Sequence, residues 1–200
     1  MAAGSVIYVH GMGGSAAEAE HYSPLFPGYD VTGFDYKSQT PWEAKEEFRA
    51  FFGSALDPCK PTVLIANSIG AYFLMGAKIA RNVKRAVFIS PVVDMENIII
   101  SMMKRANVTE NELKERGEIV TESGETLSFK YLSYVREYPI SWSVPTKIIY
   151  GENDLLVPHS LVTEFAEHIN ASLYVLKGGE HWFHTKEQMD FIAATIKERL

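Results

Sequence analysis

The stretch T-V-L-I-A-N-S-I-G-A-Y-F, Thr62 to Phe73, decides the fold. Its apolar run ends at Asn67 and Ser68, and residues of helical composition follow. This pattern predicts a strand, a sharp turn at Ser68 and a helix, as in a nucleophile elbow. Strand and helix approach closely at such a turn and need small neighbours, and Ala66 stands in the first of the two usual glycine positions. A serine that only caps the helix is the alternative reading of this segment alone.

A glycine-rich turn follows another buried strand, in V-I-Y-V-H-G-M-G-G-S from Val6 to Ser15. Glycines allow such a turn to present backbone N–H groups inward. We expect the N–H groups of Met12 and of Ile69, the residue after the serine, to form an oxyanion hole. The turn has neither the lysine of a phosphate-binding loop nor the spacing of a dinucleotide fingerprint, so no nucleotide site is expected.

Two later strands end in glycine followed by polar residues. I-I-Y-G-E-N-D ends at Asp154, and Y-V-L-K-G-G-E-H-W-F contains His181. The chain order Ser68, Asp154, His181 is the nucleophile–acid–base order of the α/β-hydrolases. Each residue follows a predicted parallel strand, at the sheet edge where ligands bind in open α/β folds. The sequence therefore predicts a catalytic triad.

Other residues compete for these roles. Asp94 also follows a strand and is the alternative acid, and His184 is the alternative base. We favour Asp154 because it lies in the G-E-N-D turn, and His181 because it directly follows G-G-E. His10 is expected to shape the oxyanion turn.

Together these motifs resemble the α/β-hydrolase superfamily, and the resemblance covers nearly the whole chain. The segment G-E-N-D-x-x-V-P, Gly151 to Pro158, resembles the acid-bearing loop of small microbial serine esterases and serine peptidase-like hydrolases. The resemblance implies an α/β fold with a mostly parallel six-stranded sheet, helices on both faces and a lid insertion. The departure is Ala66 at the elbow.

The hydrophobic pattern along the chain predicts the same alternation of strands and helices in a single domain, residues 1–200. Strands are expected at Val6–Val9, Tyr29–Phe34, Thr62–Ala66, Ala86–Ile89, Thr146–Tyr150 and Leu173–Leu176. Helices are expected at Ala16–Tyr22, Pro41–Leu56, Ile69–Ile79, Ser160–Ile169 and Lys186–Glu198. Pro41 suits a first helical turn after Thr40, and Ser160 and Thr185 suit N-caps.

Residues 94–142 break the alternation and are expected to form a lid or cap within that domain. A charged helix is predicted at Thr109–Arg116, a hairpin at Ile119–Phe129 and an amphipathic helix after it. A lid would exclude water and shape the acyl pocket, whereas a second packing layer is the other interpretation. The side chains expected near substrate are Met102, Met103, Tyr131, Tyr134 and Trp142.

Composition places limits on the class of protein. The 200 residues are 46% hydrophobic and 22% charged, as in soluble globular domains. The net charge of −6 and the lack of a basic run argue against nucleic-acid binding. No signal-peptide pattern and no membrane-length apolar stretch are present, and the single cysteine, Cys59, excludes an internal disulfide. A cytoplasmic protein with no membrane contact is expected.

We therefore expect a serine hydrolase of the carboxylesterase class that cleaves a small-molecule acyl ester through an acyl-enzyme. No cofactor or metal is expected, because the six histidines lack ligand spacings such as H-E-x-x-H. Peptidase or thioesterase activity, transfer to an acceptor other than water, and a non-catalytic binding protein on the same fold remain alternatives.

Overall fold

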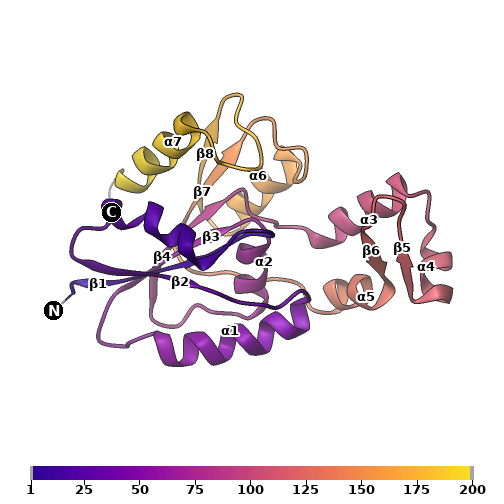
Figure 1. The fold of residues 1–200 in the computed structure, drawn as a ribbon, viewed down its shortest axis with the longest axis horizontal. Coiled ribbons are helices and arrows are strands. Elements are labelled where there is room, and N and C mark those ends of the chain that lie inside the picture. The colour runs from indigo at the N-terminus through magenta and orange to yellow at the C-terminus, as the bar shows by residue number, and fades with distance from the viewer. Residues whose placement is uncertain (1, 199–200) are drawn as a thin grey trace. The chain divides into compact units, whose positions relative to one another are not determined.

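The computed structural model describes residues 2–198, and the chain forms two compact units. Of the described residues, 2–93 and 141–198 belong to the larger unit and 94–140 to the smaller. The larger unit carries a six-stranded sheet and the smaller a two-stranded one (Figure 1).

The sheet of the larger unit has the strand order β2-β1-β3-β4-β7-β8, and all neighbouring strands pair in parallel. The predicted mostly parallel six-stranded sheet is thus confirmed. Its strands are β1 Gly4–Val9, β2 Tyr29–Phe34, β3 Thr62–Asn67, β4 Val83–Ile89, β7 Thr146–Gly151 and β8 Ser172–Leu176. The central strands read as continuous apolar runs because both faces of the sheet are covered.

The strand order reverses at β1, which lies between β2 and β3. Parallel pairing sets Val9 beside Ala66, so β1 and β3 end next to each other. The glycine-rich turn after β1 and the serine turn after β3 therefore lie side by side, at a switch point where α/β sheets bind ligands.

Helices cover both faces of this sheet, and Figure 1 shows α1 and α7 on opposite sides of it. One face packs against α7 and two 3₁₀ helices through a core that includes Tyr8, Tyr22 and Ile192. On the other face Phe34 stacks on Phe51, with ring centroids 3.9 Å apart, which fixes α1 against β2. The helices are α1 Pro41–Ala55, α2 Ile69–Gly76, α6 His159–His168 and α7 Lys186–Lys197, and the 3₁₀ helices are η1 Ala16–His21 and η2 Ser23–Leu25.

Three helix predictions need correction. The segment predicted as a helix at 16–22 is the 3₁₀ helix η1, and α2 ends at Gly76 rather than Ile79. Helix α6 begins after Pro158, so Ser160 is not its N-cap. The caps at Thr40 and Thr185 are confirmed, since each hydroxyl accepts a backbone N–H three residues on.

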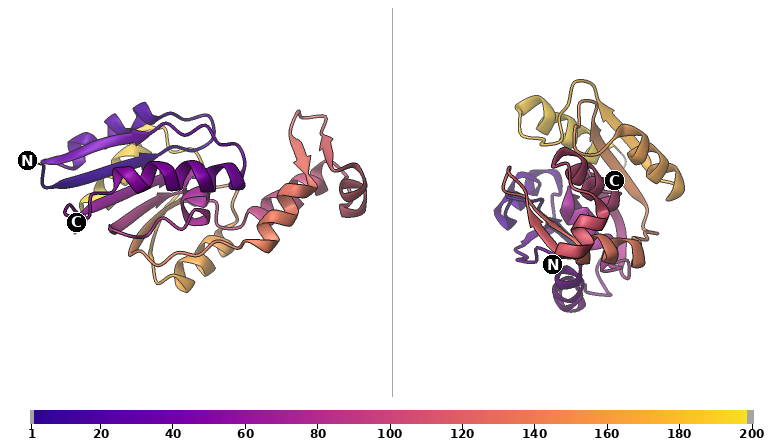
Figure 2. Two further views of the ribbon diagram at one scale, coloured as in Figure 1. Left: turned by 90° about the horizontal axis from the view of Figure 1, so that it is seen from below. Right: turned by 90° about the vertical axis from the view of Figure 1, so that its right-hand side faces the viewer.

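The smaller unit packs three helices with a β-hairpin, shown in two further views in Figure 2. The charged helix, the hairpin and the amphipathic helix are as predicted, while α3 was not predicted as a helix. Leu113, Leu127 and Leu132 form its buried centre. This unit ends at Ile140, and its function as a lid remains a prediction. Its elements are α3 Met95–Arg105, α4 Glu110–Arg116, β5 Glu118–Val120, β6 Thr126–Ser128 and α5 Phe129–Glu137.

Candidate active site

Three side chains from three loops of the larger unit form one hydrogen-bonded chain. Ser68 Oγ lies 2.8 Å from His181 Nε2, and His181 Nδ1 lies 2.6 Å from Asp154 Oδ2. The serine follows β3, the aspartate follows β7 and the histidine follows β8. The structure thus brings together residues up to 113 positions apart, in the order that a nucleophile, a base and an orienting acid require.

The serine occupies a strained turn. Its backbone has φ 49° and ψ −121°, in a region that residues other than glycine rarely adopt. Its N–H donates to the Ile89 carbonyl (2.9 Å), and its carbonyl accepts from the N–H of Val92 (3.2 Å). Such a conformation costs about 1–3 kcal/mol and persists only where its surroundings fix it. Here the end of β4 does so, and the hydroxyl is held toward His181.

Asp154 is anchored by its own loop. Its side chain is fully buried, and its Oδ1 accepts the N–H groups of Leu156 (2.8 Å) and Val157 (3.0 Å). The phenol of Tyr150 donates to the Val157 carbonyl (2.7 Å). Burial, and then the charge of Asp154, raises the pKa of Tyr150 to about 12, so the phenol keeps its proton as a donor. The second carboxylate oxygen of Asp154 is left for His181.

The loops carrying Asp154 and His181 are joined to each other. The Asn153 N–H donates to the Gly179 carbonyl (2.7 Å), and the Glu152 N–H donates to the Leu176 carbonyl (3.0 Å). A Cβ on Gly151 would lie 2.6 Å from the Gly179 oxygen, so only glycine allows this approach. Gly151 and Gly179, which belong to the two glycine-containing turns of the sequence, therefore set the spacing between Asp154 and His181.

The glycine-rich turn contacts the serine directly. A Cβ on Gly11 would lie 3.2 Å from Ser68 Cβ, and one on Gly70 would lie 2.3 Å from the His10 carbonyl oxygen. Ile69 is the first residue of α2, so its N–H has no acceptor within the helix. Met12 and Ile69 therefore belong to two adjoining segments beside Ser68. Their function as oxyanion donors remains a prediction.

Gly70→Ala tests this close approach. The added methyl group cannot fit 2.3 Å from the His10 oxygen, so the turn must shift away from the serine. We expect a loss of about 1–3 kcal/mol in stability and about a 100-fold loss in ester hydrolysis, measured by thermal unfolding and kcat/KM. Gly76→Ala is the matched control, because a Cβ there meets nothing within 4 Å, and it should leave hydrolysis unchanged. Full activity of Gly70→Ala would contradict the role given to this contact.

Tyr36 is a residue of this site that no sequence motif marks. Its buried phenol donates to the His10 carbonyl (3.0 Å), and its ring stacks on the His10 imidazole with centroids 4.2 Å apart. The same ring packs edge-on against Phe73 of α2. Burial, and then the charge of Glu47, raises the pKa of Tyr36 above its usual range, so the phenol stays a donor. Tyr36 thus links the glycine-rich turn to the helix that starts at the elbow.

Tyr36→Phe keeps the ring contacts and removes only the hydrogen bond to His10. A buried carbonyl then loses a donor, at a cost of about 1–3 kcal/mol, and the turn is less firmly oriented. We expect kcat for an ester to fall about tenfold with little change in KM. Tyr29→Phe, at the opposite edge of the sheet, should change neither constant. Equal kcat values for wild type and Tyr36→Phe would count against this positioning role.

Asp94 and His184, the alternative acid and base, make no hydrogen bond to Ser68, Asp154 or His181 among those of the described residues. Asp94 is the N-cap of α3, and its Oδ1 accepts the Asn97 N–H (2.9 Å). His184 is exposed, with its Nδ1 hydrogen-bonded to the Trp182 carbonyl (2.7 Å) and its ring stacked on that indole. The hydrogen bonds to Ser68 and Asp154 are made by His181.

The three predicted substrate-binding residues fall into both units. Trp142 is buried in the larger unit, where its ring lies 5.1 Å from Phe88 and its Nε1 donates to Thr146 Oγ1 (2.7 Å). These contacts make it a packing residue there. Met102 on α3 and Tyr134 on α5 are half-buried in the smaller unit. Their contact with substrate remains a prediction, as it does for Trp142.

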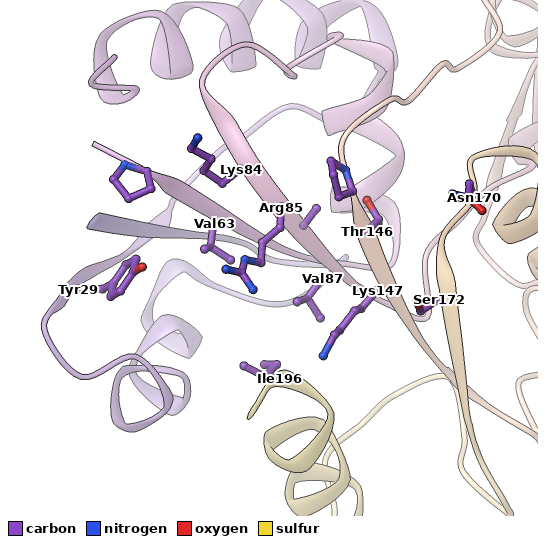
Figure 3. A pocket seen from close by; sticks show the side chains of 13 residues that line it. Tyr29, Val63, Lys84, Arg85, Val87, Thr146, Lys147, Asn170, Ser172 and Ile196 are labelled. Carbon is purple, nitrogen blue, oxygen red and sulfur yellow. The ribbon is translucent and has the colours of Figure 1, made fainter. Parts of the chain in front are cut away.

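A cavity of about 530 Å³ lies at the other edge of the sheet, near the amino ends of the strands (Figure 3). Figure 3 shows Lys84 and Arg85 of β4 pointing in opposite directions. The ammonium group of Lys147 donates a hydrogen bond to the Thr195 carbonyl near the end of α7 (2.7 Å). These cations are therefore not gathered on one ligand.

Within residues 2–198, no group of three or more His, Cys, Asp or Glu side chains is placed to hold a metal ion. In the same range no helix is both long and apolar enough to cross a membrane.

Comparison with known proteins finds no matching family profile. In sequence the chain is similar to a protein of Mycoplasma genitalium named "Putative esterase/lipase 3", with 23% identity over 88% of this chain and 76% of that protein.

In structure the chain is similar to Est1E from Butyrivibrio proteoclasticus, with a TM-score of 0.73 and 17% identity over 98% of this chain and 86% of that one. It is also similar to the mouse alpha/beta hydrolase domain-containing protein 10, with a TM-score of 0.75 and 18% identity over 97% and 88% of the two chains. An esterase from Pyrococcus furiosus matches with a TM-score of 0.64 and 22% identity over 98% of this chain and 81% of its own.

Proposed function

Because the chain has the α/β-hydrolase fold, we propose that it is a serine hydrolase that cleaves carboxylic esters. The observation that carries the proposal is the hydrogen-bonded chain Ser68–His181–Asp154 beside a glycine-rich turn. The names of similar proteins, which include an esterase and "Putative esterase/lipase 3", point to the same reaction class.

The reaction proceeds in two steps. His181 Nε2 takes the proton of Ser68 as Oγ attacks the ester carbonyl carbon, and the backbone N–H groups of Met12 and Ile69 hold the oxyanion. Asp154 fixes the imidazole tautomer and stabilises its charged form. His181 then gives its proton to the departing alkoxide, which leaves an acyl group on Ser68. Water, deprotonated by His181, releases the carboxylic acid and restores the serine.

The triad also favours an enzyme over a binding protein on the same fold. Ser68 is half-buried in a strained turn, and its Oγ lies 2.8 Å from His181 Nε2. The buried carboxylate of Asp154 orients that imidazole. This arrangement is typical of an activated nucleophile. A binding protein needs none of these features.

Labelling with a fluorophosphonate, read by intact mass, tests the proposal. The wild-type chain should gain one adduct and Ser68→Ala none. Ser54→Ala, which removes an exposed serine on α1, should label like wild type. If folded wild-type protein gives no adduct, the serine is not activated and the proposal fails.

A further inference from the structure

Exposed apolar side chains adjoin the triad residues along the chain. Among residues 2–198, Leu155 is 98% exposed, Met12 84%, Trp182 69% and Leu156 41%. Leu155 and Leu156 follow Asp154 directly, Trp182 follows His181, and Met12 follows the glycine that contacts Ser68. Most large apolar side chains of the described residues are buried, and a group of exposed ones beside a reactive site marks a binding surface.

These side chains divide between the two sides of the serine. Met12 belongs to the turn after β1, which pairs with β3 on one side. Leu155, Leu156 and Trp182 follow β7 and β8, on the other side. The second group thus belongs to the side of His181, and Met12 to the side of the oxyanion turn.

Hydrogen bonds and a ring contact order the loops that carry the second group. The N–H groups of Leu156 and Val157 are both bound to Asp154 Oδ1, which fixes the path of the chain through Leu155. Trp182 is held by stacking on His184, with ring centroids 4.4 Å apart. The apolar exposure therefore comes from an ordered loop structure, in which the same hydrogen bonds that orient the acid present the leucines to solvent.

The reaction chemistry identifies which part of the ester lies beside His181. When the acyl bond breaks, His181 Nε2 must lie within hydrogen-bonding reach of the departing alkoxide oxygen. The alcohol part of the ester therefore lies next to His181, while the acyl part stays on Ser68. Resting on the proposed function, we propose that Leu155, Leu156 and Trp182 form a docking surface for an apolar alcohol group. The enzyme then selects esters by the length of their alcohol more than by their acid.

Two series of esters separate the sides of the site. Ethyl, butyl and hexyl acetate lengthen the alcohol at constant acyl group, and ethyl acetate, butanoate and hexanoate lengthen the acyl group at constant alcohol. Hydrolysis is followed by pH-stat. An open apolar surface buries about half of each added CH₂, so kcat/KM should rise about twofold per CH₂, or about sixteenfold over the four CH₂ groups from ethyl to hexyl acetate. The acyl series should rise less.

The double variant Leu155→Gln/Trp182→Gln should flatten the alcohol series and leave the dependence of kcat/KM on acyl length unchanged. Val175→Gln, which removes an exposed apolar side chain on β8, is the control and should leave both series unchanged. A flat alcohol series in wild type, or a rise that survives in the double variant, overturns the proposal. So does a variant that only converts a dimer to a monomer in size-exclusion chromatography, because the patch then binds a second copy.

A binding measurement separates failure of this proposal from failure of the proposed function. Titration of Ser68→Ala with 1-hexanol and ethanol, followed by isothermal titration calorimetry, needs no ester hydrolysis. Saturable binding of hexanol that Leu155→Gln and Trp182→Gln abolish supports the surface even if no ester is hydrolysed. Absence of such binding overturns it, whatever the fluorophosphonate result.

Discussion

Replacing His181 with alanine is expected to lower kcat for an ester on the order of a million-fold, with little change in fold stability. The imidazole is the group 2.8 Å from Ser68 Oγ that can accept its proton, and without it the hydroxyl is a weak nucleophile at neutral pH. Because members of a triad act as a unit, adding Ser68→Ala to this variant should cost little more. The measurement is steady-state hydrolysis of ethyl acetate, together with fluorophosphonate labelling.

His184→Ala is the matched control. His184 is another histidine three residues along the same loop, but its ring nitrogen is bound to a carbonyl and its ring stacks on Trp182. We expect its loss to change kcat less than threefold. If His184→Ala were the inactive variant and His181→Ala the active one, the assignment of the base would be wrong.

The residues that the sequence located share one property, which is that each lies in a short motif directly after an apolar strand. Ser68, Asp154 and His181 could be placed at one edge because parallel strands end together. Gly70 and Gly151 were visible for a related reason, since a turn that permits only glycine records a close contact in the sequence.

What the sequence did not reveal depends on contacts between distant segments. Tyr36 follows β2 and meets His10 only after the strands have paired, and nothing in its local sequence distinguishes it from a core tyrosine. Asp94 looked like a candidate acid because it follows a strand, but it caps a helix that the local pattern did not predict.

Predictions from local sequence also misplaced the start of one helix and the type of another. Ser160 has the chemistry of an N-cap, yet α6 starts after Pro158 because the Asp154 loop and the Tyr150 phenol hold the chain up to Val157. The segment predicted as the first helix forms the 3₁₀ helix η1 instead.

Asp154→Asn should lower kcat by about 10⁴-fold while the fold is kept, because the substitution reverses one hydrogen bond. In the wild type Oδ1 is bound by the N–H groups of Leu156 and Val157, and Oδ2 faces His181 Nδ1. An asparagine keeps its oxygen on those two donors, so its NH₂ group must point at Nδ1. The imidazole then accepts at Nδ1 and carries its proton on Nε2, where it can no longer accept the proton of Ser68.

Asp94→Asn is the control that separates the two candidate acids. The asparagine oxygen can still accept the Asn97 N–H at the start of α3, so we expect activity within about twofold of wild type, because Asn caps helices as well as Asp. Steady-state kcat for both variants, with thermal unfolding to check the fold, makes the comparison. Loss of activity in Asp94→Asn with Asp154→Asn unimpaired would transfer the acid to the end of β4. The opposite result would tie catalysis to the carboxylate that the Leu156 and Val157 N–H groups hold in place.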